Sequence, residues 1–169
     1  MTKDRSALIE ALVPHAAFAP SDPRGETPAA LAQRLADSGY LFLRGLVDPS
    51  ALTAVRADIL ELCARDGWLD PDAPRSQGVW SGMPFPDHQT YMRLYRDLIR
   101  LDSFNRLSAT PGLIAALSAI LGGPVFAHRR NIARISFPGN AAATTQPHQD
   151  HFYIRGTTET YTLWIPTSD

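Results

Sequence analysis

The chain has 169 residues, of which 44% are hydrophobic and 20% are charged, and its formal net charge is −1. This length and composition suit one globular domain, or most of one. A charge so close to zero argues against nucleic-acid or membrane-surface binding driven by bulk electrostatics. One cysteine, Cys63, excludes an internal disulfide, and its helical apolar surroundings predict a buried, inert thiol. We find no signal peptide and expect no run that spans a bilayer, so we expect a cytoplasmic protein.

The first elements in chain order are a lead-in and a helix. Residues 1–26 contain three prolines and a glycine after a short apolar patch, which predicts a loosely attached lead-in. Thr27 then offers an N-cap and Pro28 a first helical residue. Residues 29–38 continue the helix, and Gly39 stands where a helix-ending glycine belongs. The rest of the chain, residues 27–169, is expected to be the N-terminal and central part of a single domain.

A strand over 40–47 is expected next, and Asp48 repeats the capping signal at the start of a helix that reaches about Arg65. Residues 66–87 follow as a long loop with seven glycines and prolines. A loop of this length suits a lid over a pocket, although its large apolar side chains, Trp68, Trp80, Met83 and Phe85, equally suit an additional part of the core. Further helices are expected over 88–101 and 111–121.

The last third of the chain has the composition of strands. Residues 124–137 are rich in β-formers and are ended by Pro138-Gly139, and a polar loop then leads to Pro147. A second strand is expected from His148, then a Gly-Thr turn and a third strand over 161–165. With helices first and strands later, we expect an α+β protein in which helices buttress a jelly roll, a double-stranded β-helix.

His148-x-Asp150 is the pattern that carries chemistry. On a strand, residues two apart point to the same face, so an imidazole and a carboxylate would converge on one point. Such a pair forms two arms of the 2-His-1-carboxylate triad that holds non-haem Fe(II). The same spacing also fits a stray polar pair on a surface strand. The other histidines are expected in structural or surface roles: His15, His88, His128 and His151.

Together these segments resemble the phytanoyl-CoA dioxygenase-like Fe(II)/2-oxoglutarate oxygenases, from about Tyr40 to the C-terminus. The resemblance is carried by Tyr40–Val47, Phe104–Leu107 through Leu121–Pro124, Ile135–Gly139, Pro147–Asp150 and Thr162–Pro166. It implies a jelly-roll oxygenase that uses Fe(II), O₂ and 2-oxoglutarate to hydroxylate a small organic substrate. His148 and Asp150 would be iron ligands. Trp164 would pack against the cosubstrate, Ala133 on a neighbouring strand would be a further contact, and Arg93 would reach the cosubstrate as a cation.

The chain departs from the family pattern at its end. The family has a second iron histidine on a later strand, soon followed by an arginine that grips 2-oxoglutarate, whereas no histidine follows His151 here. We therefore expect a fragment of a longer product with an incomplete barrel, and we expect these 169 residues alone not to be a competent oxygenase. If they were competent, His128 would be the first candidate for the third ligand.

Two other functions were weighed. A related Fe(II) halogenase needs a small residue in place of the carboxylate so that chloride can bind, and Asp150 argues against it. A non-catalytic jelly-roll module for binding or interaction is kept open by the missing histidine. The identity of the substrate and the oligomeric state are not indicated by the sequence.

Overall fold

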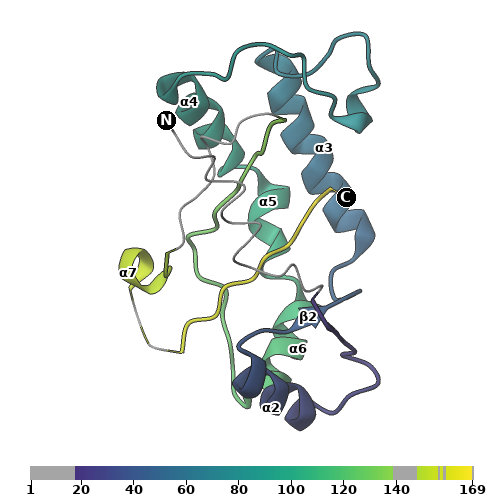
Figure 1. Ribbon diagram of the computed structural model, residues 1–169, viewed down its shortest axis with the longest axis vertical. Coiled ribbons are helices and arrows are strands. Elements are labelled where there is room, and N and C mark those ends of the chain that lie inside the picture. Colours follow the sequence, from purple (N-terminus) through teal and green to yellow (C-terminus); the bar gives the residue numbers. More distant parts are fainter. Residues whose placement is uncertain (1–17, 139–147, 156, 158, 169) are drawn as a thin grey trace, which may run out of the picture. The chain divides into compact units, whose positions relative to one another are not determined.

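The computed structural model describes residues 18–138, 148–155, 157 and 159–168 (Figure 1). These residues fall into two compact units, one drawn from Met1–Leu46 and Ile114–Val125, the other from Val47–Leu113 and Phe126–Asp169. The elements in chain order are β1 (Pro20–Ser21), α2 (Pro28–Ser38), β2 (Phe42–Leu43), α3 (Pro49–Arg65), η1 (Arg75–Gln77), α4 (His88–Leu98), α5 (Asp102–Leu107), α6 (Pro111–Leu121) and α7 (His151–Ile154).

The first unit confirms the predicted helix and both of its ends. The Thr27 hydroxyl accepts a hydrogen bond from the backbone N–H of Ala30 at 3.2 Å and so satisfies one of the free donors at the start of α2. At the other end, Gly39 has a φ of 76°, and its N–H donates to the Leu35 carbonyl. Glycine adopts this left-handed conformation without the steric cost that a Cβ would bring.

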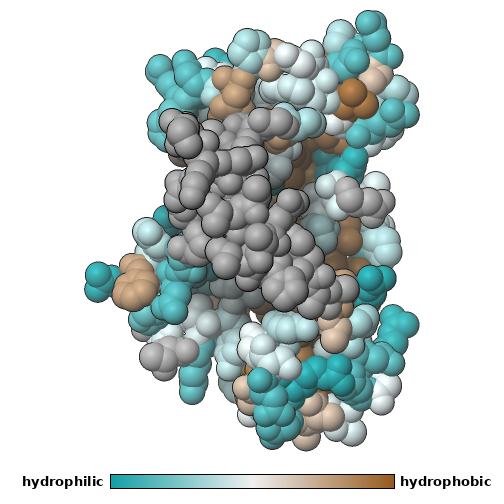
Figure 2. All heavy atoms as spheres, in the orientation of Figure 1, coloured by the Kyte–Doolittle hydropathy of each residue, from teal (hydrophilic) through white to brown (hydrophobic). Residues whose placement is uncertain are grey.

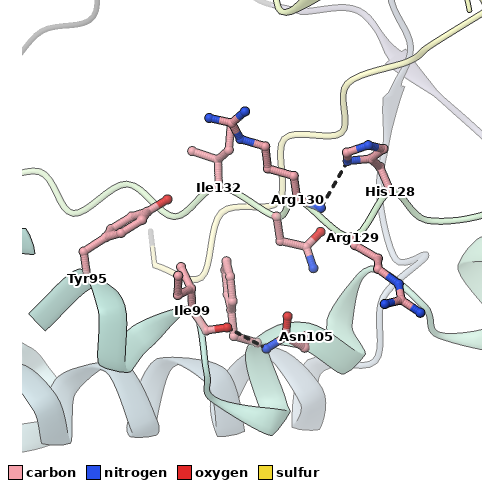
Figure 3. A pocket seen from close by; sticks show the side chains of 9 residues that line it. Tyr95, Ile99, Asn105, His128, Arg129, Arg130 and Ile132 are labelled. Carbon is pink, nitrogen blue, oxygen red and sulfur yellow. Dashed lines mark hydrogen bonds between the residues drawn. The ribbon is translucent and has the colours of Figure 1, made fainter. Parts of the chain in front are cut away.

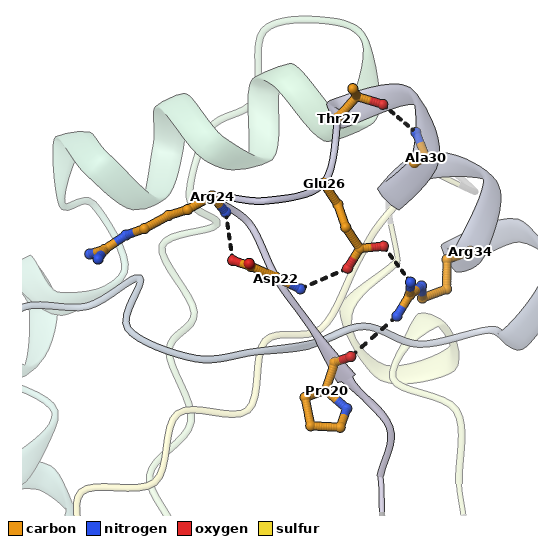
Figure 4. A network of polar contacts seen from close by, with 7 residues as sticks. All are labelled: Pro20, Asp22, Arg24, Glu26, Thr27, Ala30 and Arg34. Atoms are coloured by element: carbon orange, nitrogen blue, oxygen red, sulfur yellow. Dashed lines mark hydrogen bonds and ion pairs between the residues drawn. The ribbon is translucent and has the colours of Figure 1, made fainter.

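Side chains join the segment before α2 to the helix itself (Figure 4). Arg34 on α2 donates to the Pro20 carbonyl at 3.2 Å and forms an ion pair with Glu26, whose carboxylate also accepts from the backbone N–H of Asp22. The described part of the expected lead-in is therefore bound to α2 by hydrogen bonds and an ion pair, and is not loosely attached. Residues 1–17, which include the apolar patch and His15, lie outside the described residues.

The sheet of the first unit is small. β1 and β2 pair in parallel, with Pro20 opposite Phe42 and Ser21 opposite Leu43. The strand expected over 40–47 is thus shortened to two residues. These are the sole paired strands among the described residues, and the jelly roll stays a prediction.

The second unit is built on helices whose starts the sequence marks. Asp48 accepts from the backbone N–H of Ser50 at 2.8 Å and confirms the predicted cap of α3. Asp87 accepts from Thr90 at 2.7 Å in the same way at the start of α4. α4 ends at Leu98, three residues earlier than expected, and the short α5 that follows was not predicted.

The core of this unit is a cluster of four buried side chains, Cys63, Trp68, Leu94 and Leu98. Trp68 is 0% exposed. Its ring stacks on Tyr91 with 6.0 Å between centroids and meets Phe137 edge-on at 5.3 Å. Trp80 and Met83 also pack against the cluster. The loop over 66–87 therefore supplies part of the core, which was one of the two interpretations of its large apolar side chains.

The buried Cys63 thiol gives a testable chemical consequence. Burial, aided by the negative charge of Asp66, raises the pKa of Cys63 to about 11. The thiolate is the nucleophile, so at pH 8 its population should be about 100-fold lower than at the ordinary pKa near 9. We expect a chromogenic disulfide reagent to label Cys63 far more slowly in native protein than in urea. Equal rates in the two conditions would contradict this burial.

The same shift predicts a pH dependence of stability. The unfolded chain loses the thiol proton near pH 9, whereas the folded chain holds it to about pH 11. Between these values the folded state binds more protons, so the free energy of unfolding should fall as pH rises. Denaturant titrations of native protein and Cys63→Ala across this window measure the effect, because the variant should lack this part of the slope.

Two extended segments end the second unit. From Asn131 to Phe137, half-buried and exposed residues alternate with a period of two, as in a strand packed on one face. Neither this stretch nor the described residues from 159 to 168 have a strand partner in the part of the chain that the structure describes. The stretch from Asn131 to Phe137 therefore has the burial pattern of a sheet without its hydrogen bonds, whereas the described residues from 159 to 164 are all exposed. Gly139, the polar loop, Pro147 and Gly156 of the expected turn lie outside the described residues.

Several large aromatic side chains in the described part of the chain after α6 are exposed. Phe126 is 86%, Trp164 79% and Phe152 71% exposed. Figure 2 shows that hydrophilic residues form most of the described surface on the visible face, with hydrophobic residues set between them. The exposed aromatic residues contribute little to the core described above.

One stretch corrects an expectation about membranes. By length and composition alone, residues Asp102–Leu121 could cross a bilayer, so the expectation that no such run exists is wrong. The structure divides this stretch into α5 and α6. Mostly buried core helices of soluble proteins meet the same criterion, whereas 17% of this stretch is buried.

Candidate metal site

His148 and Asp150 lie in direct contact. The distance from His148 Nε2 to Asp150 Oδ1 is 3.3 Å, and about a third of each side chain remains exposed. The contact is an ion pair when the imidazole is protonated. The structure thus brings together the two residues that the sequence singled out as iron ligands.

The backbone that holds them differs from the expected strand. Asp150 has helical dihedral angles, φ −59° and ψ −31°, and its carbonyl accepts hydrogen bonds from the N–H groups of Tyr153 and Ile154 at 2.9 Å each. These bonds close the single turn of α7 (Figure 1). The hydrogen bonds of a turn form within one segment, whereas the hydrogen bonds of a strand need a neighbouring strand. The expected strand start is wrong for these residues, and the convergence of His148 and Asp150 does not come from the period of a strand.

The Asp150 carboxylate is also held from a second direction. Thr162 Oγ1 donates a hydrogen bond to Asp150 Oδ2 at 2.7 Å, across a separation of 12 residues. The His148 ring meets Tyr153 edge-on, with centroids 5.8 Å apart. Thr162 escaped the sequence reasoning. Nothing in the spacing marks it, because its contact depends on the path of the chain between α7 and the last extended segment.

These donors fit two neighbouring positions on a divalent metal. Imidazole nitrogen and carboxylate oxygen lie about 2.1 Å from zinc, so two such donors at right angles are about 3.0 Å apart and at a tetrahedral angle about 3.4 Å apart. The observed 3.3 Å falls in this range. A hydrogen bond to the free carboxylate oxygen, such as that from Thr162, is the kind of support that orients metal ligands.

Comparison with known proteins adds no family. No family model and no solved structure matches this chain.

Within the residues that the structure describes, no group of three or more histidine, cysteine, aspartate and glutamate side chains could hold a metal ion. His151, the nearest further histidine in sequence, is exposed and begins α7. His88 begins α4 and is exposed, and His128 is exposed on the extended segment after α6. The described candidate site therefore offers two potential metal donors, one nitrogen and one oxygen.

The three residues expected at the cosubstrate lie in different surroundings. Arg93 on α4 is 61% exposed and forms an ion pair with Asp66 at 3.4 Å. Ala133 is half-buried against the core cluster and lines a cavity of about 860 Å³ beside α3. Trp164 is 79% exposed. Their roles toward 2-oxoglutarate stay predictions.

Proposed function

We propose that this chain belongs to an Fe(II)- and 2-oxoglutarate-dependent oxygenase that hydroxylates a small organic substrate, with His148 and Asp150 as iron ligands. The observation that carries the proposal is the 3.3 Å approach of His148 Nε2 to Asp150 Oδ1, since the two convergent donors are those that the sequence pattern selected. A cytoplasmic location, and O₂ with a small-molecule substrate as partners, form part of the same proposal.

The residues of this chain would have defined tasks. Asp150 would supply a negative charge and one oxygen to the metal, and His148 a neutral nitrogen, which requires Nε2 to be free of its proton. Thr162 would keep the carboxylate oriented through its hydrogen bond to Oδ2. The iron, when bound, would supply the activation of O₂ coupled to oxidative decarboxylation of 2-oxoglutarate.

A non-catalytic binding or interaction module is the alternative. The exposure of Trp164, at 79%, favours it, because the side chain expected against the cosubstrate packs little within the described chain. The two functions differ in one measurable property: only the oxygenase requires a specific divalent metal at His148 and Asp150.

Metal binding by purified variants tests the proposal. Fe(II) is titrated under anaerobic conditions into wild-type protein, His148→Ala and His151→Ala, with heat as the readout. We expect His148→Ala to weaken binding at least about tenfold, because it removes one of the two described ligands. His151→Ala is the matched control, an exposed histidine three residues away, and should bind as the wild type does. Equal affinities for His148→Ala and His151→Ala would refute the assigned site.

A further inference from the structure

A long stretch of the chain carries positive charge without any acidic residue. Between Asp102 and Asp150, residues 103–149 contain no aspartate or glutamate, but they contain four arginines: Arg106, Arg129, Arg130 and Arg134. The stretch therefore has a formal charge of +4, whereas the whole chain has −1. Such a separation of charge produces a local positive potential that attracts anions.

Part of this stretch forms one wall of a cavity of about 600 Å³ in the second unit (Figure 3). The segment from His128 to Ile132 faces residues from α4 and α5, with Tyr95 and Asn105 among them. No acidic side chain lines the cavity, and Ile99, Phe104 and Ile132 give it apolar surface. A volume of this size suits a small organic molecule.

The cations of this cavity are not neutralised by the described protein. Arg65, Arg75 and Arg106 each form an ion pair with a carboxylate. Arg129 and Arg130 are exposed and take part in no ion pair with any carboxylate among the described residues. Figure 3 shows their guanidinium groups pointing in different directions.

The neutral polar groups around the cavity are oriented by the backbone. His128 Nδ1 accepts a hydrogen bond from the N–H of Arg130 at 3.1 Å, which leaves Nε2 as the donor of a neutral ring. Asn105 Nδ2 donates to the carbonyls of Ile99 and Leu101 at 2.9 and 2.8 Å. Its amide oxygen is thereby left as an acceptor for a ligand hydroxyl or amine.

We infer that this cavity binds a small organic anion, with a carboxylate or phosphate group at Arg129 or Arg130 and an apolar part against Ile99, Phe104 and Ile132. Guanidinium groups suit both anions, since their planar donors match pairs of oxygens. The inference does not rest on the proposed oxygenase, because neither His148 nor Asp150 lines this cavity.

Titration of the metal-free protein with three probes of similar size tests the inference. Benzoate presents a carboxylate and phenyl phosphate presents a phosphate, each attached to a phenyl ring. Benzyl alcohol, which has the same ring, is the uncharged control. At low ionic strength we expect either anion to bind and benzyl alcohol not to bind. The anion with the lower Kd identifies carboxylate or phosphate as the preferred group.

Arginine variants locate the binding. Replacing both residues (Arg129→Gln with Arg130→Gln) should raise the Kd of the preferred anion at least about tenfold, because charge-assisted hydrogen bonds are lost. Arg96→Gln is the matched control: it removes one positive charge from an exposed position on α4 outside the cavity. Its Kd should stay within about twofold of the wild-type value.

Amide chemical-shift changes in the wild-type protein give a second readout that does not depend on the folding of a variant. They should concentrate in residues 95–105 and 128–132. The inference is overturned if benzyl alcohol binds as well as the anions, if no probe binds, if Arg96→Gln weakens binding as much as the double variant, or if the shift changes lie elsewhere. Because iron and 2-oxoglutarate are absent, such a failure leaves the proposed oxygenase untouched.

Discussion

If the proposed oxygenase function holds, Asp150→Ala should abolish iron-dependent release of succinate from 2-oxoglutarate. The variant removes the carboxylate that lies 3.3 Å from His148 and so removes both a ligand and a negative charge from the proposed metal site. The described residues offer two candidate ligands there, and the loss of one would leave His148 alone to hold a metal on this part of the chain. Succinate release, measured with and without Fe(II), is the readout.

Three further variants test separately the charge of Asp150, the hydrogen bond that orients its carboxylate, and the effect of removing an aspartate elsewhere. Asp150→Asn keeps the size of the side chain and an oxygen for Thr162 but loses the charge, so it should also be inactive. Thr162→Val removes the hydrogen bond to Oδ2 and should lower activity by about 10- to 100-fold, as the loss of support for a metal ligand does. Asp72→Ala, at an exposed position in the long loop, should be unaffected. Full activity in Asp150→Ala would exclude the proposed mechanism.

Trp68→Ala should destabilise the second unit by about 3–5 kcal/mol, the range for truncating a large buried aromatic side chain. Trp68 is 0% exposed and contacts Tyr91, Phe137 and the buried leucines of α4. Its removal would leave a cavity at the centre of the core cluster. The free energy of unfolding from urea denaturation, followed by circular dichroism, measures the loss.

Trp68→Phe should cost considerably less, because the aromatic ring is kept and no hydrogen bond is lost. The Trp68 Nε1 atom is buried and has no hydrogen-bond partner among the described residues, so the phenyl ring leaves no acceptor unsatisfied. Trp164→Ala is the matched control. That tryptophan is 79% exposed, and its replacement should change stability by about 0.5 kcal/mol or less. Similar losses for Trp68→Ala and Trp164→Ala would contradict the assigned core.

The sequence by itself determined both ends of α2 and the start of α3. Thr27, Gly39 and Asp48 mark helix boundaries through hydrogen bonds and dihedral angles that involve residues within four positions. Such signals act within one segment, and the rest of the fold does not need to form before they take effect. The end of α4 and the separate α5 were missed, because the apolar pattern continues past Leu98 without a glycine or proline to stop it.

The formation of the expected strands depends on more than the local sequence pattern. The alternation from Asn131 to Phe137 is visible in the sequence and in the burial, yet a paired strand also needs a neighbour whose position no local signal specifies. Near Asp150 the carbonyl is satisfied by the N–H groups of Tyr153 and Ile154, and a turn replaces the expected strand. Local hydrogen bonds were sufficient there, so the β-propensity of the segment did not decide its structure.

Only the tertiary structure decided which side chains meet. The sequence selected His148 and Asp150 by type and spacing, but their contact arises in a turn, and Thr162 joins them from 12 residues away. The sequence also could not show that Trp68 of the long loop is the centre of a core. Nor could it show that Arg129 and Arg130 line a cavity opposite Tyr95. Composition and spacing specify which groups are present, whereas the path of the chain between distant segments brings those groups within contact distance.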